Sequence, residues 1–122
     1  MLKEILLVGL GGGVGSIVRY LSSIFINKYN PSSFPWATFT VNIIGCLLIG
    51  LIIGIISKNN LSNEIKLLFV GGFCGGYTTF STFAVENITL IQTNHISLSI
   101  LYMTGSVIFG LLSVWLGLVL VK

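Results

Sequence analysis

Residues 71–83 read GGFCGGYTTFSTF, in which glycines and then hydroxyl side chains alternate with aromatic rings. The segment lies inside an apolar stretch that is long enough to cross a membrane. At that depth, irregular backbone is tolerated only where it is buried in protein or lines a wet cavity. A glycine-interrupted membrane segment is also a good pointer to the ion or substrate site of a transporter. The segment is therefore predicted to carry the function of the chain.

Polar side chains continue this pattern on the neighbouring predicted helices. Asn42 lies in the apolar segment FTVNIIG (39–45), where an amide must face either protein or water because lipid cannot satisfy it. Tyr102 and Ser106 fall on one stripe of the last helix. A third stripe follows the glycines and consists of Thr79, Thr82, Glu86 and Thr89. One such stripe is explained by helix packing, whereas three beside a broken helix favour a hydrated path.

Arg19 and Glu86 are the two charges that lie well inside the predicted membrane segments. A charge in this position is a functional hypothesis by default. The alternative is that each side chain extends to the membrane surface, about 10 Å away at about 1.5 Å per residue. The first and third predicted helices, which carry these charges, run in the same direction. The two charges should therefore lie at a similar depth in the membrane. If they are functional, they either form a polar pair or line one vestibule.

The distribution of charge predicts the fold class. The chain has 122 residues, of which 54% are hydrophobic and 7% charged, and its mean hydropathy is +1.02. A spanning helix needs about 20 apolar residues, and uncharged stretches of this length recur along the chain. We expect an all-α membrane protein with four transmembrane helices, at residues 3–26, 36–56, 64–93 and 96–120. The third is expected to break near residues 75–79, close to the bilayer midplane, leaving half-helices at about 64–74 and 80–93.

Other functional classes of protein fit the sequence poorly. The basic residues form no run or helical face suited to nucleic acid. The glycines of GLGGGVGSIVRY (9–20) miss the G-x-G-x-x-G spacing of a nucleotide loop. They form small-xxx-small pairs instead, which let helices approach closely. No nucleophile with a base and an orienting group is apparent, so an enzyme is not expected.

The loop charges give only a mild orientation signal. Both termini and the second loop share one side, which carries four lysines, Lys3, Lys58, Lys66 and Lys122. The other side carries Lys28, together with Arg19 if it lies near enough to the helix end. A weak positive-inside bias is what a protein that inserts both ways would show.

The three motifs GGGVGSIVRY (11–20), FTVNIIG (39–45) and GGFCGGYTTFSTF (71–83) occur in this order on a four-span chain of this length. Together they resemble the CrcB/Fluc family of small fluoride channels, and the resemblance covers essentially the whole chain. It implies a multi-pass protein of the cytoplasmic membrane that passively exports fluoride and so gives fluoride resistance. It also implies a homodimer of two protomers inserted in opposite orientations.

The resemblance further implies two fluoride pathways and a central structural sodium ion, held by backbone carbonyls at the breaks in the third helix. By motif position, the carbonyl donors are Gly75 and Thr78. The pathway residues implied by motif position are Asn42, Phe80, Phe83, Tyr102 and Ser106. The hydroxyls of Thr79, Ser81 and Thr82 are added as pathway candidates from the residues themselves.

The chemistry of these residues suits fluoride independently of the resemblance. Fluoride is a small, strong hydrogen-bond acceptor that needs donors to replace its water. Hydroxyl, amide and backbone N–H groups supply them without a fixed cation that would trap the ion. The edges of phenylalanine rings are electropositive, and passage requires binding that is weak enough for exit.

Two other functions stay open at this stage. A small four-helix multidrug-type proton antiporter needs a membrane carboxylate, for which Glu86 is the candidate. A non-transporting membrane assembly subunit would use the polar stripes only to hold helices together.

Overall fold

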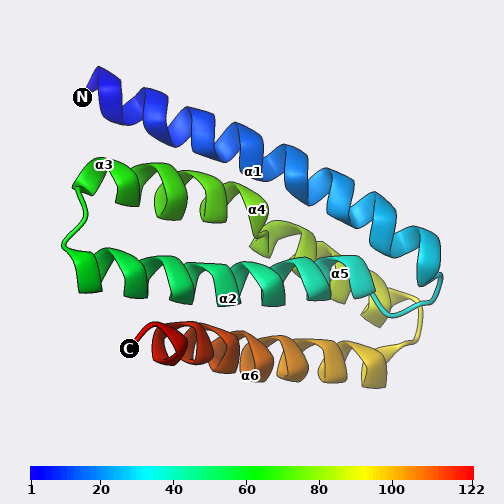
Figure 1. Ribbon diagram of the computed structural model, residues 1–122. Coiled ribbons are helices and arrows are strands. Elements are labelled where there is room, and N and C mark those ends of the chain that lie inside the picture. Colours follow the sequence, from blue (N-terminus) through cyan, green and yellow to red (C-terminus); the bar gives the residue numbers. More distant parts are fainter.

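Four long helices run back and forth in a computed structural model that describes residues 1–122 (Figure 1). The first span is α1 (Leu2–Tyr29) and the second is α2 (Trp36–Asn59). The third is divided into α3 (Asn63–Lys66), η1 (Leu67–Cys74), α4 (Gly75–Tyr77) and α5 (Phe80–Gln92). The fourth span is α6 (Ile96–Val121). All four are long and apolar enough to cross a membrane, which confirms the predicted fold class at this level.

The helices form two packed pairs, which the third span connects. α2 packs along the length of α6, and α1 packs against η1 and α4. Beyond the break, α5 packs on α6. Both termini and the turn between α2 and α3 lie at one end of the bundle, on the left in Figure 1. The two other loops lie at the opposite end.

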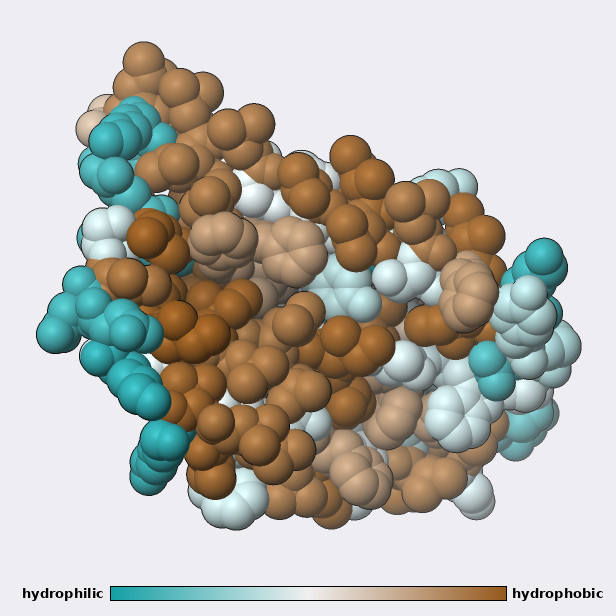
Figure 2. Space-filling model, in the orientation of Figure 1, coloured by the Kyte–Doolittle hydropathy of each residue, from teal (hydrophilic) through white to brown (hydrophobic).

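The outer surface of the bundle is apolar. Only 16 of the 122 residues are buried, so most large aliphatic side chains face outward, as in Leu10, Ile17 and Leu111. Figure 2 shows a hydrophobic band across the middle of the molecule, with hydrophilic residues gathered at its two ends. This is the surface expected of a protein whose solvent is the lipid bilayer, and the chain is a multi-pass membrane protein.

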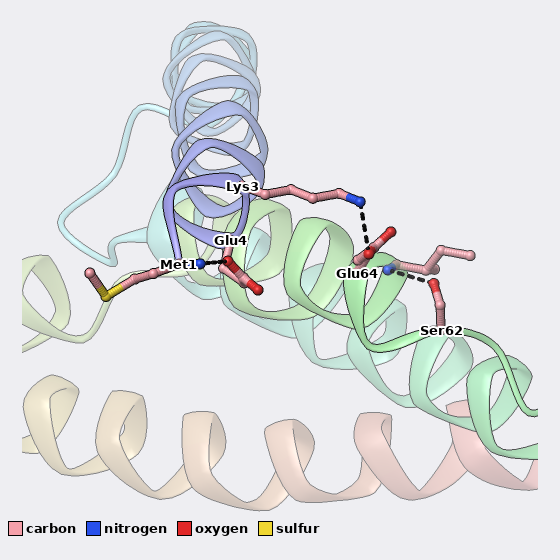
Figure 3. Close-up of polar contacts among 6 residues, drawn as sticks. Met1, Lys3, Glu4, Ser62 and Glu64 are labelled. Carbon is pink, nitrogen blue, oxygen red and sulfur yellow. Dashed lines mark hydrogen bonds and ion pairs between the residues drawn. The ribbon is translucent and has the colours of Figure 1, made fainter.

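The helix ends are fixed by local chemistry. α1 and α2 each run three residues past their expected ends, to Tyr29 and Asn59. Asn60 ends α2 in the left-handed conformation (φ 50°), as is common at a helix C-terminus. Ser62 then accepts a hydrogen bond from the Ile65 amide and caps α3. At the same end, Lys3 pairs with Glu64 at 2.9 Å and ties α1 to the start of the third span (Figure 3).

The third span differs from expectation in two ways. Residues Leu67–Cys74, expected as part of a regular half-helix, are π-helical, a form that often occurs at functional sites. The break is also shorter than predicted, because Gly75 and Gly76 still belong to the helical turn α4. Only Thr78 (φ −87°, ψ 158°) and Thr79 (φ −148°, ψ 123°) are extended. The glycines therefore do not form the break itself.

Gly72 and Gly76 instead pack closely against α1, as the small-xxx-small pairs predicted for that helix. A Cβ at Gly11 or Gly15 would collide with the backbone of η1, and one at Gly76 would collide with the backbone of Gly12. Between α2 and α6, a Cβ at Gly117 would lie 2.6 Å from the Leu47 carbonyl oxygen. The other pair, Gly9 and Gly13, has no neighbour within 4 Å and faces outward.

Gly117 and Gly110 offer a matched test of this packing, since both are buried on α6. A Cβ at Gly117 meets the backbone of α2, which cannot move aside, whereas one at Gly110 meets only the Cys46 Sγ atom at 3.6 Å. We expect Gly117→Ala to lower the free energy of unfolding by about 1–3 kcal/mol. Gly110→Ala should be neutral or stabilise the helix by up to about 1 kcal/mol. Denaturation in detergent measures both, and equal stability of the two variants would contradict this packing.

Candidate functional site

The break in the third span is held open by the side chain of Asn42. Its Oδ1 accepts a hydrogen bond from the Thr79 amide at 2.9 Å, and its Nδ2 donates to the Thr79 carbonyl at 3.0 Å. The amide thus pairs with both backbone groups of one extended residue, as a neighbouring strand would. An asparagine Nδ2 carries two hydrogens, so one donor remains. The sequence left helix packing and pore lining open for Asn42, and the geometry accommodates both.

This pairing leaves backbone carbonyls of the first half-helix without their usual partners. In a continuous α-helix the Thr79 amide would bond the Gly75 carbonyl, but it is donated to Asn42 instead. No backbone amide bonds to the Thr78 carbonyl. The two carbonyls predicted to hold a sodium ion, those of Gly75 and Thr78, therefore lie at a point where helical hydrogen bonding is interrupted.

The carbonyl of Gly76 is satisfied from the other side, by α1. Arg19 Nε donates to it at 3.1 Å, and Ser16 Oγ lies 3.5 Å away. Arg19 also places a positive charge beside the C-terminal end of α4, where a helix favours a cation. α1 thus covers one carbonyl of the break.

On the far side of the break, α5 begins with a capped N-terminus. Thr79 Oγ1 accepts a hydrogen bond from the Thr82 amide at 3.3 Å, as an N-cap threonine does. The first amides of the helix have no helical acceptor, and the helix dipole is positive there. The start of α5 is therefore suited to an anion.

An open hollow of about 390 Å³ lies against the break and brings together most of the predicted site. Seven predicted residues line it: Asn42, Gly75, Thr78, Thr79, Phe80, Phe83 and Ser106. Ser106 Oγ is shielded from solvent and has no hydrogen-bond partner within the chain. Leaving a buried hydroxyl unpaired costs about 1–3 kcal/mol, and Ser106 is the one residue of this wall whose hydroxyl lacks a partner.

Tyr102 and Glu86 lie behind this hollow and do not line it. Tyr102 is fully buried, and its ring meets the Phe83 ring at a 62° tilt with centroids 4.9 Å apart. Its hydroxyl donates to Glu86 Oε1 at 2.8 Å, and Thr38 Oγ1 donates to Glu86 Oε2 at 2.9 Å. This network joins α2, α5 and α6 around the half-buried carboxylate.

Three other predicted pathway residues lie partly or wholly on the surface of α5. Phe80 is 78% exposed although it also lines the hollow, and its ring leans on Phe83 with centroids 5.8 Å apart. Ser81 and Thr82 are exposed and lie outside the hollow. As pathway residues, these two stay predictions.

Arg19 and Glu86 form no ion pair with each other. Arg19 binds the Gly76 carbonyl, whereas Glu86 binds the hydroxyls of Thr38 and Tyr102. A polar pair is therefore not formed within a single chain, because each charge is taken by another polar partner. The vestibule stays a prediction for both residues.

Sequence reasoning missed two polar contacts that the structure brings together. One is the hydrogen bond from Thr38 to Glu86. Asn87 and Ser99, both buried, are joined by a hydrogen bond of 2.9 Å. A polar residue in an apolar helix was the available signal, but the spacing does not tell which helix it faces.

The fold and this site define a small helical membrane protein whose third span is broken beside a hollow lined by hydroxyl, amide and aromatic groups. Residues 6–118 match the family model described as CrcB-like protein, Camphor Resistance (CrcB), and the chain belongs to this family.

Relatives named fluoride-specific ion channel FluC align over nearly the full length of the chain. The one from Flavobacterium psychrophilum is 50% identical, covering 99% of this chain and 98% of the relative. The one from Azobacteroides pseudotrichonymphae is 44% identical, covering 100% and 98%. A third, from Phocaeicola vulgatus, is 44% identical, covering 96% and 97%. The family suggested by the sequence motifs is thereby confirmed.

Substitutions of Arg19 separate the role of its hydrogen bond from that of its charge. The Nε2 of a glutamine occupies nearly the position of the arginine Nε, so Arg19→Gln keeps a donor for the Gly76 carbonyl. Arg19→Leu removes it, and we expect a loss of about 1–3 kcal/mol in the free energy of unfolding. Denaturation in detergent compares the two variants. If Arg19→Gln lowers the free energy of unfolding as much as Arg19→Leu does, the stabilisation comes from the charge and not from the hydrogen bond.

Proposed function

We propose that this protein is a fluoride-specific channel that lets fluoride leave the cytoplasm passively across the cell membrane and so gives fluoride resistance. The names of its relatives support this function, since these relatives align with nearly the whole chain. The observation in the site that carries the proposal is the unpartnered hydroxyl of Ser106 in a hollow shared with Asn42 and two phenylalanines.

The donors around this hollow suit a small anion. Ser106 has a hydroxyl without a partner, and Asn42 has one amide hydrogen left after its bond to Thr79. The start of α5 adds the positive end of a helix dipole. No Lys, Arg or His side chain lines the hollow. An ion can therefore exchange water for these donors without being trapped by a fixed charge.

Phe80 and Phe83 form the aromatic wall of the proposed path. Ring edges carry partial positive charge, so an edge facing the hollow attracts an anion while excluding water. The Tyr102 ring contacts the Phe83 ring on the side away from the hollow, and the Tyr102 hydroxyl donates a hydrogen bond to Glu86. Tyr102 therefore acts in this proposal by supporting Phe83. Ser81 and Thr82 on the exposed face of α5 would serve the path where a second protomer covers that face.

The driving force is the membrane potential. An inside-negative potential moves an anion outward with about 2.3 kcal/mol per charge per 100 mV. A concentration ratio of ten corresponds to about 1.4 kcal/mol. A passive pore is thus sufficient to hold cytosolic fluoride below the external level, and no nucleotide or coupled ion is required.

The channel is proposed to work as a homodimer of protomers in opposite orientations. Phe80 is largely exposed, and the hollow beside it is open on one side. A second protomer would cover both. The mild charge bias of the loops permits insertion in both directions. The break falls halfway along the third span, Asn63–Gln92, so in an antiparallel pair two breaks can meet at the same depth.

A structural sodium ion at that meeting point fits the donors present. The Gly75 and Thr78 carbonyls of both protomers would hold it, since the Thr78 carbonyl receives no backbone amide and the usual donor to Gly75 is taken by Asn42. These are hard, neutral oxygens, which suit a monovalent cation. The chain has no group of three His, Cys, Asp or Glu side chains suited to a metal ion. Such an ion would offset the carbonyl dipoles and join the two protomers.

A proton antiporter is less well supported. Glu86 is its candidate carboxylate, but both of its oxygens accept hydrogen bonds and it does not line the hollow. A non-transporting subunit does not account for the unpaired Ser106 hydroxyl. Fluoride efflux without a proton gradient separates the channel from both alternatives.

The proposed path is tested by replacing either aromatic edge with an aliphatic side chain. We expect Phe80→Ile and Phe83→Ile to lower fluoride efflux from liposomes by up to about tenfold, taking for the lost ring edge the 0.5–1.5 kcal/mol, roughly, that an aromatic pair contributes. Phe69→Ile, also in the third span but outside the hollow, is the control. Size-exclusion chromatography checks that the assembly is kept.

Three results would refute the channel itself. They are equal permeation of chloride and fluoride, no fluoride efflux from the unaltered protein, and a strict need for a proton gradient. Normal efflux of both variants would refute only the aromatic path.

The sodium site is tested through the stability of the dimer. Binding of one ion to the folded dimer alone should add about 1.4 kcal/mol to its stability for each tenfold rise in sodium above the dissociation constant. Thermal dissociation is measured in sodium chloride and in N-methylglucamine chloride at equal ionic strength. Equal stability in both salts would rule out the sodium site.

A further inference from the structure

Asn87 and Ser99 form a buried polar contact between the two helices of the α5–α6 hairpin. Ser99 Oγ donates to Asn87 Oδ1 at 2.9 Å, and the two residues are 0% and 5% exposed respectively. It is the one side-chain hydrogen bond of the chain in which both partners are buried. None of the proposed pathway residues takes part in it.

Asn87 extends this contact to the backbone of Phe83. Its Nδ2 donates to the Phe83 carbonyl at 2.9 Å, one turn earlier in α5. A continuous chain of hydrogen bonds therefore runs from Ser99 on α6, through the Asn87 side chain, to the residue whose ring lines the hollow.

The position of this chain in the hairpin sets the register of the two helices. The hairpin turns at residues 93–95, and Asn87 and Ser99 lie on either side of that turn. One turn further along each helix, the Phe83 and Tyr102 rings meet with centroids 4.9 Å apart. Successive side chains of an α-helix point about 100° apart around its axis, so the direction of the Phe83 ring is set by the rotation of α5. A change in that rotation would carry the ring off Tyr102 and away from the hollow.

We propose that Asn87 is a positioning residue for permeation. It ties the rotation of α5 to α6, so that Phe83 stands between Tyr102 and the ion path. The inference rests on the proposed role of Phe83 in the path, and it adds the residue that holds the ring there. Asn87 itself lies outside the hollow and does not touch the ion.

The test compares three variants of the full-length protein in liposomes. Asn87→Leu keeps a similar volume and removes both hydrogen bonds. Ser99→Ala removes only the link to α6. Asn59→Leu is the matched control, because Asn59 Nδ2 also donates to a carbonyl one turn earlier, that of Ile55, but at the exposed end of α2. Fluoride efflux should fall on the order of tenfold in Asn87→Leu, less in Ser99→Ala and not in Asn59→Leu.

A second measurement reports on the ring without using transport. 4-Fluorophenylalanine is placed at position 83, and its 19F NMR signal is recorded in each background. The signal should shift or broaden in Asn87→Leu and Ser99→Ala as the ring leaves Tyr102, and it should be unchanged in Asn59→Leu. If Asn87→Leu fails to fold, the smaller change Ser99→Ala decides the question.

An unchanged 19F signal together with normal efflux in a folded variant would overturn the proposal. A change of equal size in Asn59→Leu would also overturn it, because any lost side-chain bond would then have the same effect. If Phe83→Ile conducts normally while the 19F signal still responds to Asn87, the proposed path fails and the anchoring of the ring stands.

Discussion

The two hydrogen bonds between the Asn42 side chain and the Thr79 backbone are the interaction on which the rest of the site depends. A helix broken within a membrane exposes amides and carbonyls that lipid cannot satisfy, at a cost of several kcal/mol each. Asn42 takes both groups of Thr79 at once. The Thr79 amide is then withheld from Gly75, and the chain can leave the helix for two residues and start a new one at Phe80.

The break has opposite polarity on its two sides, so one interrupted helix offers a site for a cation and a site for an anion. The first half-helix ends in carbonyl oxygens, of which Arg19 covers that of Gly76 from the side of α1. The second half begins with free amides and the positive end of a dipole. The carbonyl side is suited to a cation and the amide side to an anion. A single interrupted helix thus supports both the proposed sodium site and the proposed fluoride path, without a charged side chain in the hollow.

Packing between the spans relies on small residues, because lipid offers no hydrophobic force that would drive helices together. Gly11, Gly15 and Gly76 bring α1 against the first half of the third span, and Gly50 and Gly117 bring α2 against α6. α5 is held differently. Its contacts with α6 include the hydrogen bonds of Glu86 with Tyr102 and of Asn87 with Ser99. The half of the third span that carries Phe80 and Phe83 is thereby fixed in rotation by directional bonds, which matter most where a ring must face one way.

The sequence by itself determined the class, the four spans and the family, because uncharged stretches of membrane length and three ordered motifs are local properties of the chain. It also placed a break in the third span and named seven residues that line the hollow, partly from their polarity in an apolar helix and partly from the resemblance to the family. Only the tertiary structure decided what interrupts the third span. The hydrogen bonds of Asn42, and not the glycines, end the first half-helix, and Leu67–Cys74 is π-helical. The tertiary structure also decided that Arg19 and Glu86 bind different partners and that Asn87 meets Ser99. The physical reason is that spacing shows which residues share a face of one helix, whereas the helix that each face meets depends on how all four pack.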